Sequence, residues 1–245
     1  MISVCIVTYN RLDCLVKTID SIRNTLDSIN LDYEIIVSDD CSPIHVQEKI
    51  KNIHGIDHLF ISETNKGLGN NTNKGLKHCR GKYIIQLQDD WIYIGKPEYI
   101  LNAMKILENN QSISIVNFIK DQNCNYFTNY LDDIEYRILT TESSKESKVS
   151  HLPYTDNPHI KRLNFHNEVG YYKENVPMTI METEFARRIS SFEDNLIVDL
   201  STDLFLHIGD HKSFNPGRRK QKLKNFITST PVLKQIFTLY KVLKK

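Results

Sequence analysis

The first third of the chain alternates short β-rich runs with longer segments of helical periodicity, and this alternation limits the folds open to it. Apolar residues are consecutive in the β-rich runs, whereas between the runs they recur every three or four residues. The expected strands cover residues 2–7, 33–37, 58–61 and 82–87, and the expected helices cover residues 12–29, 46–53 and 69–79. Strands with two apolar faces, separated by helices, predict a doubly wound α/β domain with a mostly parallel sheet covered on both sides.

The composition suits one large domain followed by a tail. The chain has 245 residues, of which 40% are hydrophobic and 25% are charged, as in proteins that bury a core. No stretch reaches the roughly 18 apolar residues of a membrane-spanning helix, and no basic leader precedes the first strand. The five cysteines are scattered and form no CxxC pair, which indicates neither a disulfide framework nor a zinc site. We therefore expect a cytoplasmic protein.

Polar residues follow each of the four expected strands, within residues 8–11, 38–42, 63–67 and 88–90. The carboxyl ends of parallel strands meet at one edge of a sheet, where such sheets bind ligands. Asp89 and Asp90 are adjacent carboxylates directly after an apolar strand, which is costly unless a positive group compensates them. Solvated exit loops without a ligand are the structural alternative. No GxGxxG motif follows the first strand, so dinucleotide binding is not expected.

Four segments together resemble the nucleotide-sugar-binding half of family 2 glycosyltransferases with the GT-A fold. They are ISVCIVTYNR, YEIIVSDDCS, NKGLGNNTNKG and GKYIIQLQDDW, in this order and spacing. The resemblance covers residues 1–120 well and the remainder loosely. It implies a Rossmann-like sheet and the transfer of a hexosyl or N-acetylhexosaminyl group from a nucleoside diphosphate sugar, with UDP as the favoured nucleotide. It also implies a divalent metal, Mn²⁺ or Mg²⁺, and inversion at the anomeric carbon.

The resemblance implies donor contacts from the strand exits. The positions that match or neighbour the family's donor-binding residues are Thr8, Tyr9, Arg11, Asp39, Asn65, Gly67, Asn73, Gln88 and Asp89. The carboxylate of Asp39 can accept the imide proton of uracil. Asp40 is the alternative partner, or it caps the following helix. Thr72 stands where the family often has an arginine, and the candidates to share the work of that arginine are Asn71, Asn73 and Lys74.

The implied metal site departs from the family's DXD motif, because Gln88 occupies the first aspartate position. Asp90 matches the position that most directly holds the metal. His207 matches the C-terminal histidines that complete the site in GT-A enzymes, and His211 is the weaker candidate. A hard cation bridges the diphosphate to the protein and makes paired carboxylates tolerable. Gln88 can still bind ribose or a hydrated ion, and its presence predicts a weaker dependence on metal.

An inverting transfer needs a general base that takes the proton of the acceptor hydroxyl. In the family this carboxylate opens a helix and a basic residue follows about two turns later, and the segment METEFARR resembles that arrangement. Glu182 matches the base, and Met181 replaces its usual acidic neighbour. Asp156 and Glu184 are the alternatives. A glutamate near a helix N-terminus is also favoured by the helix dipole alone.

The expected organisation has three parts. Residues 1–120 form the nucleotide-sugar-binding half, residues 121–211 form the acceptor-binding and catalytic half of the same domain, and residues 212–245 form a basic amphipathic tail. Residues 141–161 are polar and poorly periodic, which is typical of either a flexible acceptor-side loop or plain disorder.

Charge separates the tail from the rest of the chain. Ten basic residues and no acidic residue follow Asp210. Residues 1–211 therefore contain the other 21 of the 31 basic residues and all 30 acidic residues, which gives them a formal charge of -9. Apolar residues recur near helical spacing from Phe226 to Leu243, and Pro231 is placed to open a final helix. Such a helix either lies in an anionic membrane interface or packs on the acidic body.

Taken with the resemblance, these features predict a glycosyltransferase of polysaccharide biosynthesis. The expected acceptor is a glycan or a lipid-linked saccharide, with peripheral membrane contact through the tail and no nucleic-acid partner. A nucleotidyltransferase is a second class, but it needs a glycine-rich and basic phosphate loop after the first strand, and TYNR lacks it. A noncatalytic sugar-nucleotide-binding protein is a third class, consistent with Gln88, Thr72 and Met181.

Overall fold

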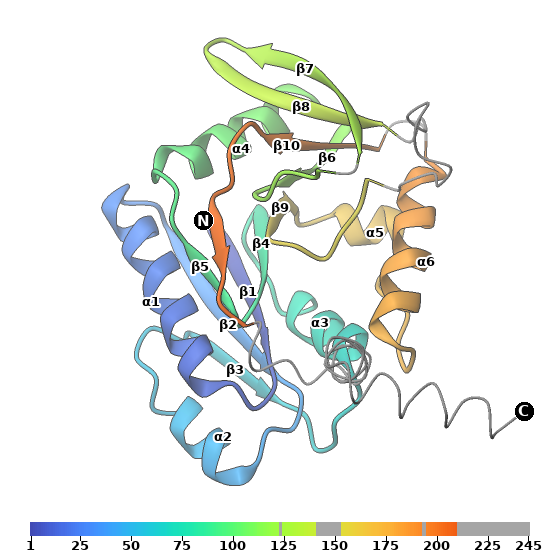
Figure 1. Ribbon diagram of the computed structural model, residues 1–245. Coiled ribbons are helices and arrows are strands. Elements are labelled where there is room, and N and C mark those ends of the chain that lie inside the picture. The colour runs from blue at the N-terminus through green and yellow to red at the C-terminus, as the bar shows by residue number, and fades with distance from the viewer. Residues whose placement is uncertain (123, 141–152, 193–194, 210–245) are drawn as a thin grey trace, which may run out of the picture. The chain divides into compact units, whose positions relative to one another are not determined.

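The four strands expected in the first third of the chain lie next to one another in one large sheet (Figure 1). The computed structural model describes residues 1–122, 124–140, 153–192 and 195–209. The sheet has the order β3 (His58–Ile61), β2 (Tyr33–Asp39), β1 (Ile2–Thr8), β4 (Tyr83–Gln88), β9 (His159–Arg162), β6 (Ile113–Asn117), β10 (Leu196–Leu200), β8 (Ile134–Thr140) and β7 (Asn125–Leu131). A small second sheet pairs β5 (Trp91–Tyr93) with β11 (Phe205–His207).

Helices cover the sheet on both sides, as the sequence predicted. They are α1 (Leu12–Ser28), α2 (Ile44–Ile50), α3 (Leu68–Leu76), α4 (Glu98–Asn109), α5 (Phe165–Val169) and α6 (Met178–Ser190). In β1, Ile2, Val4 and Ile6 belong to the core formed with α1, α2 and α4. Cys5 belongs to the core formed with α3, α5 and α6. Because successive side chains of a strand point to opposite faces, the central strands need apolar residues on both.

Parallel pairing brings the strand exits to one rim. β1 pairs in parallel with β2 and with β4, and β2 pairs in parallel with β3. Thr8 therefore lies opposite Asp39, and its neighbour Val7 lies opposite Gln88. The polar exit loops after β1, β2, β3 and β4 thus lie side by side, which confirms the predicted arrangement of the strands.

β9 runs antiparallel between β4 and β6, with Gln86 opposite His159 and Ile84 opposite Lys161. The prediction of a flexible loop over residues 141–161 is therefore wrong for residues 153–161, which are buried or half-buried. Their segment has little apolar periodicity, and its strand partner lies about 75 residues earlier in the chain, so local sequence gave no signal. Residues 141–152 lie outside the described residues.

The C-terminal tail, including His211, also lies outside the described residues. The chain divides into two units at Gly209, and the first unit, Met1–Ile208, holds every element above. Among the residues that the structure describes, none of the helices combines the length and the apolar character needed to cross a bilayer. The predicted tail and the predicted boundaries of the two halves stay predictions.

Candidate active site

Arg11 holds the paired carboxylates that follow β4. Its Nη1 donates to Oδ2 of Asp90 at 2.5 Å, and its Nη2 forms an ion pair with Oδ1 of Asp89. Oγ1 of Thr8 donates to Oδ2 of Asp89 at 2.6 Å. Both aspartates are buried. One guanidinium thus supplies part of the positive charge that we expected from a metal. The two carboxylates and the guanidinium together carry a net charge of -1 when both carboxyls are ionised.

The chain geometry at the end of β1 directs Arg11 toward this pair. Asn10 has a φ of 53°, a left-handed conformation that asparagine tolerates better than most residues. Arg11 takes the N-cap position of α1 but makes no side-chain cap, although Ser, Thr, Asp or Asn usually fills that position. Burial raises the pKa of Asp89 to about 7, while Arg11 and Thr8 act in the opposite direction.

His207 lies beside Asp90, at the end of β11. Its Nε2 is 3.1 Å from Oδ2 of Asp90, and its ring packs on Trp91 with the centroids 4.7 Å apart. Oδ1 of Asp90 is buried and has no hydrogen-bond partner among the described residues. Carboxylate oxygens are the ligands that Mg²⁺ and related hard cations prefer, so this oxygen fits a divalent cation. The described residues contain no group of three or more His, Cys, Asp or Glu arranged to hold one.

The two aspartates after β2 hold the neighbouring exit loops. Asp39 has no exposed surface, and its carboxylate accepts from the backbone N–H of Ser42 at 2.8 Å and from the Ser42 hydroxyl. Asp40 accepts from the N–H of Lys66 at 2.9 Å and of Gly67 at 2.8 Å. Gly67 has a φ of 86°, which favours glycine. Neither aspartate caps α2, so the helix-capping alternative for Asp40 is wrong.

The three residues predicted to share the work of the family's arginine all form hydrogen bonds within the protein. Asn71 bonds the ends of β1 and β2. Asn73 donates to the carbonyl of Tyr172 at 2.9 Å and accepts from its N–H at 3.0 Å. Lys74 donates to the last carbonyl of β2 at 2.7 Å. Thr72 is buried, and its hydroxyl has no hydrogen-bond partner among the described residues.

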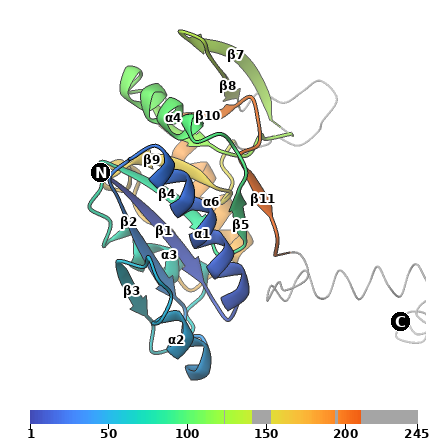
Figure 2. The same cartoon turned by 90° about the vertical axis from the view of Figure 1, so that its left-hand side faces the viewer.

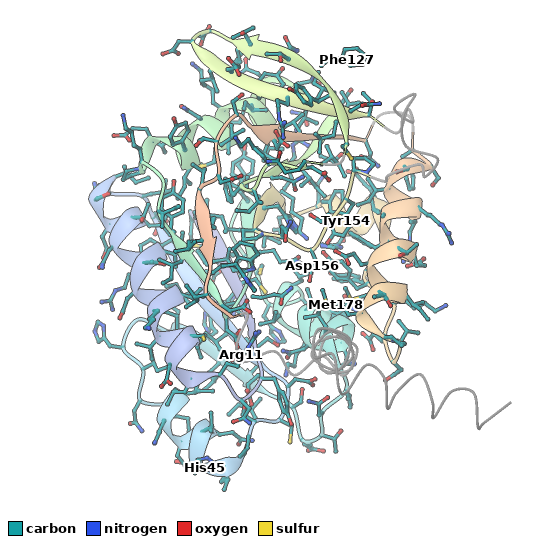
Figure 3. The ribbon with its side chains drawn as sticks, viewed as in Figure 1. Arg11, His45, Phe127, Tyr154, Asp156 and Met178 are labelled. Atoms are coloured by element: carbon teal, nitrogen blue, oxygen red, sulfur yellow. The ribbon has the colours of Figure 1, made fainter. Side chains whose placement is uncertain are left out.

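A second carboxylate cluster is built by β4, the segment before β9 and α6, and Gln88, the residue before Asp89, belongs to it. Oδ1 of Asp156 accepts from Nε2 of Gln86 at 2.7 Å, and its Oδ2 accepts from Nε2 of Gln88 at 3.2 Å. The N–H of Asp156 donates to Oε1 of Glu182 at 2.9 Å. Burial raises the pKa of Asp156 to about 7, the charge of Glu182 acts in the same direction, and Lys161 opposes both. Figure 3 shows Asp156 near the centre of the molecule.

Lys161 lies behind this cluster and is fully buried. Its Nζ donates to Oε1 of Gln86 at 2.6 Å and lies 3.2 Å from Nε2 of His159. Nδ1 of His159 faces the carbonyl of Asn157 at 2.7 Å, so Nδ1 carries the proton and Nε2 accepts from Lys161. Burial lowers the pKa of Lys161 to about 7. The amide of Gln86 therefore joins a buried amine to a buried carboxyl.

The hydrogen bonds of α6 distinguish Glu182 from Glu184. Nε of Arg188 donates to Glu184 at 3.1 Å, and a second bond from its Nη2 makes the pair bidentate. Glu182 instead faces the backbone of Asp156. The helix begins at Met178, so Glu182 lies one turn inside it rather than at its first residue.

The structure thus brings one part of the predicted set together. Grouped around the two carboxylate clusters are Thr8, Arg11, Gln88, Asp89, Asp90, Asp156, Glu182 and His207. Tyr9 is half-buried and Asn65 is exposed, and both lie in exit loops. The residues that sequence reasoning missed are Gln86, His159, Lys161 and Tyr172. A signal for Gln86 was present, because it is a polar residue inside the apolar run YIIQL.

The fold is that of the GT-A glycosyltransferases. The model of the family described as "Glycosyl transferase family 2" matches residues 3–173, and the chain belongs to this family. The family and the fold predicted from the sequence are both confirmed.

Solved structures with the same fold include residues 1–349 of S. aureus TarS in complex with UDP-GlcNAc. That structure has a TM-score of 0.56 and 22% identity, and the match covers 83% of this chain and 57% of that one. The mannosyltransferase PcManGT of Pyrobaculum calidifontis, in complex with GDP-Man and Mn²⁺, has a TM-score of 0.62 and 13% identity, and the match covers 93% of this chain and 63% of that one. At these identities the likeness shows the fold alone.

A curated relative is the Bacillus subtilis protein named "Putative glycosyltransferase EpsH". It is 32% identical over 124 residues, which are 48% of this chain and 33% of EpsH. The matches cover between 15% and 37% of the length of four curated relatives.

Proposed function

We propose that this chain transfers a sugar, with inversion, from a nucleoside diphosphate sugar to a hydroxyl of a glycan or a lipid-linked saccharide. The observation that carries the proposal is the pair of buried carboxylate clusters, of which the second includes Gln88, the residue before Asp89. Asp89 and Asp90 bind the cation that accompanies the donor diphosphate. Asp156 and Glu182 accept the proton of the acceptor hydroxyl. An inverting transfer needs both functions at one site.

A UDP-sugar is the donor that we favour. The support is the family membership of the chain and a fold shared with TarS, which was solved with UDP-GlcNAc and with UDP. The GDP-Man complex of PcManGT makes a GDP-sugar the second candidate. The nucleoside would lie along the exits of β1 and β2, near Thr8 and Tyr9. A contact from Asp39 would require Ser42 to release its carboxylate.

The donor side of the site suits a divalent cation, Mn²⁺ or Mg²⁺. Asp90 would hold the ion through its unpartnered Oδ1, with His207 beside it. When bound, the cation offsets the negative charge of the diphosphate as it departs. Because Arg11 already contributes one positive charge and Gln88 replaces an aspartate, we expect a weaker dependence on metal than a DXD site would give.

Glu182 is the general base of the proposed reaction. A bond forms between the acceptor oxygen and the anomeric carbon, the bond from that carbon to the diphosphate oxygen breaks, and the acceptor proton passes to Glu182. The N–H of Asp156 holds the Glu182 carboxylate in place. Asp156 is the alternative base, because its raised pKa also suits proton transfer near neutral pH.

Donor hydrolysis tests the proposal. A panel of UDP-, GDP- and TDP-sugars is incubated with the protein, with and without Mn²⁺, and release of nucleoside diphosphate is measured. We expect release from one nucleotide class, stimulated by the metal. Tight binding without hydrolysis or transfer would favour a noncatalytic binding protein. Pyrophosphate release from a nucleoside triphosphate and a sugar phosphate would favour a nucleotidyltransferase.

We also propose peripheral membrane contact through residues 219–245, on the cytoplasmic face. The support is the basic amphipathic pattern of this segment and the absence of acidic residues after Asp210. We expect salt-sensitive cosedimentation with anionic liposomes that is lost on deleting residues 219–245, while donor hydrolysis is retained. A full-length protein that stays in the supernatant at low salt would contradict this.

A further inference from the structure

Lys161 is a buried titratable residue that the proposed reaction does not use. It lies in β9, which pairs with β4 (Figures 1 and 2), and it has no exposed surface. Its Nζ lies 5.6 Å from the centroid of the Phe165 ring and 5.5 Å from that of Tyr172. Burying a charge is costly unless the charge is paired and hydrogen-bonded. An apolar side chain would fill the same space without that cost, so the amine indicates a function beyond packing.

The surroundings of Nζ suit the charged form of Lys161. An ammonium group has three N–H donors, and three acceptors surround it: Oε1 of Gln86 at 2.6 Å, Nε2 of His159 at 3.2 Å and the hydroxyl of Tyr172 at 3.5 Å. A neutral amine has two N–H groups and would leave one of these acceptors without its donor. These hydrogen bonds offset part of the cost of burial, which lowers the pKa of Lys161 to about 7.

Two hydrogen-bond paths lead from Lys161 to the same atom, Oδ1 of Asp156. The first passes through the amide of Gln86, whose Nε2 donates to Oδ1 at 2.7 Å. The second passes through two hydroxyls: that of Tyr172 lies 2.6 Å from that of Tyr154, which lies 3.3 Å from Oδ1. All five side chains are buried, and Figure 3 shows Tyr154 and Asp156 near each other in the middle of the molecule. Both paths therefore run through the interior of the protein.

The charge on Lys161 sets the direction of both paths. An ammonium group donates and cannot accept, so Gln86 must turn its oxygen to Lys161 and its N–H groups to Asp156. A tyrosine hydroxyl has one proton. When Tyr154 gives its proton to Oδ1, it must accept from Tyr172, which in turn accepts from Lys161. The donors along both paths then point toward Asp156, and hydrogen bonds to a carboxylate favour its charged form.

We infer that Lys161 is a positioning residue for the cluster of Asp156 and Glu182. It directs the donors of Gln86 and Tyr154 onto Oδ1 of Asp156 and so favours the carboxylate over the carboxylic acid. An ionised Asp156 favours uptake of the acceptor proton by the cluster, because each carboxylate raises the proton affinity of the other. Lys161 therefore extends the reaction to lower pH. This consequence for the rate rests on the proposed function, whereas the hydrogen bonds of Asp156 do not.

Other titratable groups face Asp156 or Lys161 from the surrounding elements. They are Cys5 of β1, Cys79 after α3, Tyr154 before β9, His159 of β9, His166 of α5, Tyr172 before α6 and Glu182 of α6. Burial lowers the pKa of both histidines and raises that of both tyrosines, so these groups are neutral near pH 7. Glu182 and Lys161 act on Asp156 in opposite directions. We therefore expect Lys161→Met and Glu182→Gln to shift the titration of Asp156 in opposite directions.

The titration of Asp156 in the full chain tests the inference. ¹³C NMR of protein labelled at the aspartate carboxyl carbon measures it, and Asp156→Asn identifies the signal. We expect the midpoint to rise by about one pH unit in Lys161→Met and by less in Tyr154→Phe, which loses only the last donor of the second path. Lys82→Met is the matched control and should leave the midpoint unchanged, because Lys82 is exposed and paired with Glu108.

The pH dependence of the rate separates this inference from the proposed function. The rate is that of hydrolysis of the donor that the nucleotide-sugar panel identifies, with water in place of the acceptor hydroxyl. We expect the acid limb of its pH profile to move to higher pH in Lys161→Met, with an unchanged KM.

An unchanged midpoint of Asp156 in a folded Lys161→Met would overturn the inference, and so would an unmoved acid limb beside a raised midpoint. If Lys161→Met does not fold, Tyr154→Phe decides: a raised midpoint supports the inference and an unchanged one overturns it. A raised midpoint in a protein that hydrolyses no donor would support the action of Lys161 on Asp156 and contradict the proposed function.

Discussion

The two buried carboxylate clusters differ in the cation that each one faces. Asp89 and Asp90 contact Arg11 directly, and a guanidinium does not lose its proton in a protein. Asp156 contacts the amides of Gln86 and Gln88, and the nearest buried amine, Lys161, lies on the far side of Gln86. Lys161 can lose its proton, because burial lowers its pKa to about 7. A fixed countercharge suits a site for a charged ligand, and a titratable one suits a site that exchanges protons.

Removing the carboxylate that faces Asp156 should have the largest effect. We expect Glu182→Gln to lower the rate of transfer roughly 10²–10⁴-fold, because an amide cannot accept the acceptor proton. Donor affinity, measured by calorimetric titration with the nucleoside diphosphate and Mn²⁺, should be unchanged. Glu184→Gln is the matched control, since its carboxylate is paired with Arg188. If Asp156→Asn abolishes transfer and Glu182→Gln does not, the base is Asp156.

Removing the fixed countercharge should come next. Arg11→Met leaves two buried carboxylates without their cation, and we expect it to lower the free energy of unfolding by about 3 kcal/mol. Mn²⁺ should raise the melting temperature of this variant more than that of the wild type, because the ion replaces part of the lost charge. Chemical denaturation and thermal melts with and without Mn²⁺ provide the measurement. An unchanged stability in Arg11→Met would show that Arg11 does not compensate the pair.

Removing one carboxylate from the donor side should affect binding more than folding. Asp90→Asn replaces an ionised partner of the diphosphate and its cation, and bonds to charged groups contribute about 1.5–3 kcal/mol. We therefore expect donor affinity in the presence of Mn²⁺ to fall about 10- to 100-fold by calorimetry, with an unchanged circular dichroism spectrum. Asp20→Asn, on the exposed face of α1, is the control. Equal affinity in Asp90→Asn and the wild type would exclude Asp90 from the donor site.

The smallest effect concerns how stability depends on pH. The pKa of Asp156 is about 7 in the folded chain against an ordinary value of 3.8, so between these pH values the folded state binds a proton that the unfolded state has released. This contribution is present in full below pH 3.8 and is lost as the pH rises through 7. Asp156→Asn should therefore remove a downward slope of up to about 1.4 kcal/mol per pH unit in this window. Denaturant titrations across the window, with Asp199→Asn as a second buried carboxylate, would show whether the slope belongs to Asp156.

The part of the fold that contains β1 to β4 could be predicted largely from local sequence. β1 to β4 and the helices between them were expected within a few residues of their observed bounds, and β3 was expected with its observed bounds. Each of these elements carries its own apolar period and its own turn residues. Glu182 and His207 were predicted as site residues from the family resemblance. The structure places both beside buried aspartates, and their roles stay predictions.

The part of the fold that contains β9 could not be predicted in the same way. His159 and Lys161 lie on one face of β9 and are both buried. Lys161 can be buried because it donates to Gln86, which lies 75 positions earlier in the sequence. The role of Arg11 was also hidden. Its ion pairs with Asp89 and Asp90 join positions about 80 residues apart, so no pattern in the local sequence indicates them.

The insertion of β9 between β4 and β6 bears on the order in which the chain folds. The contacts of β1 with β2 close a loop of about 30 residues, whereas Asp156 reaches Gln86 across 70 positions and Glu182 meets Asp156 across a further 26. Closing longer loops costs more chain entropy, and contacts between distant residues form more slowly. We therefore expect β1 to β4 to pair before β9 is in place, and the cluster of Asp156 and Glu182 to be among the last parts of the described chain to become structured.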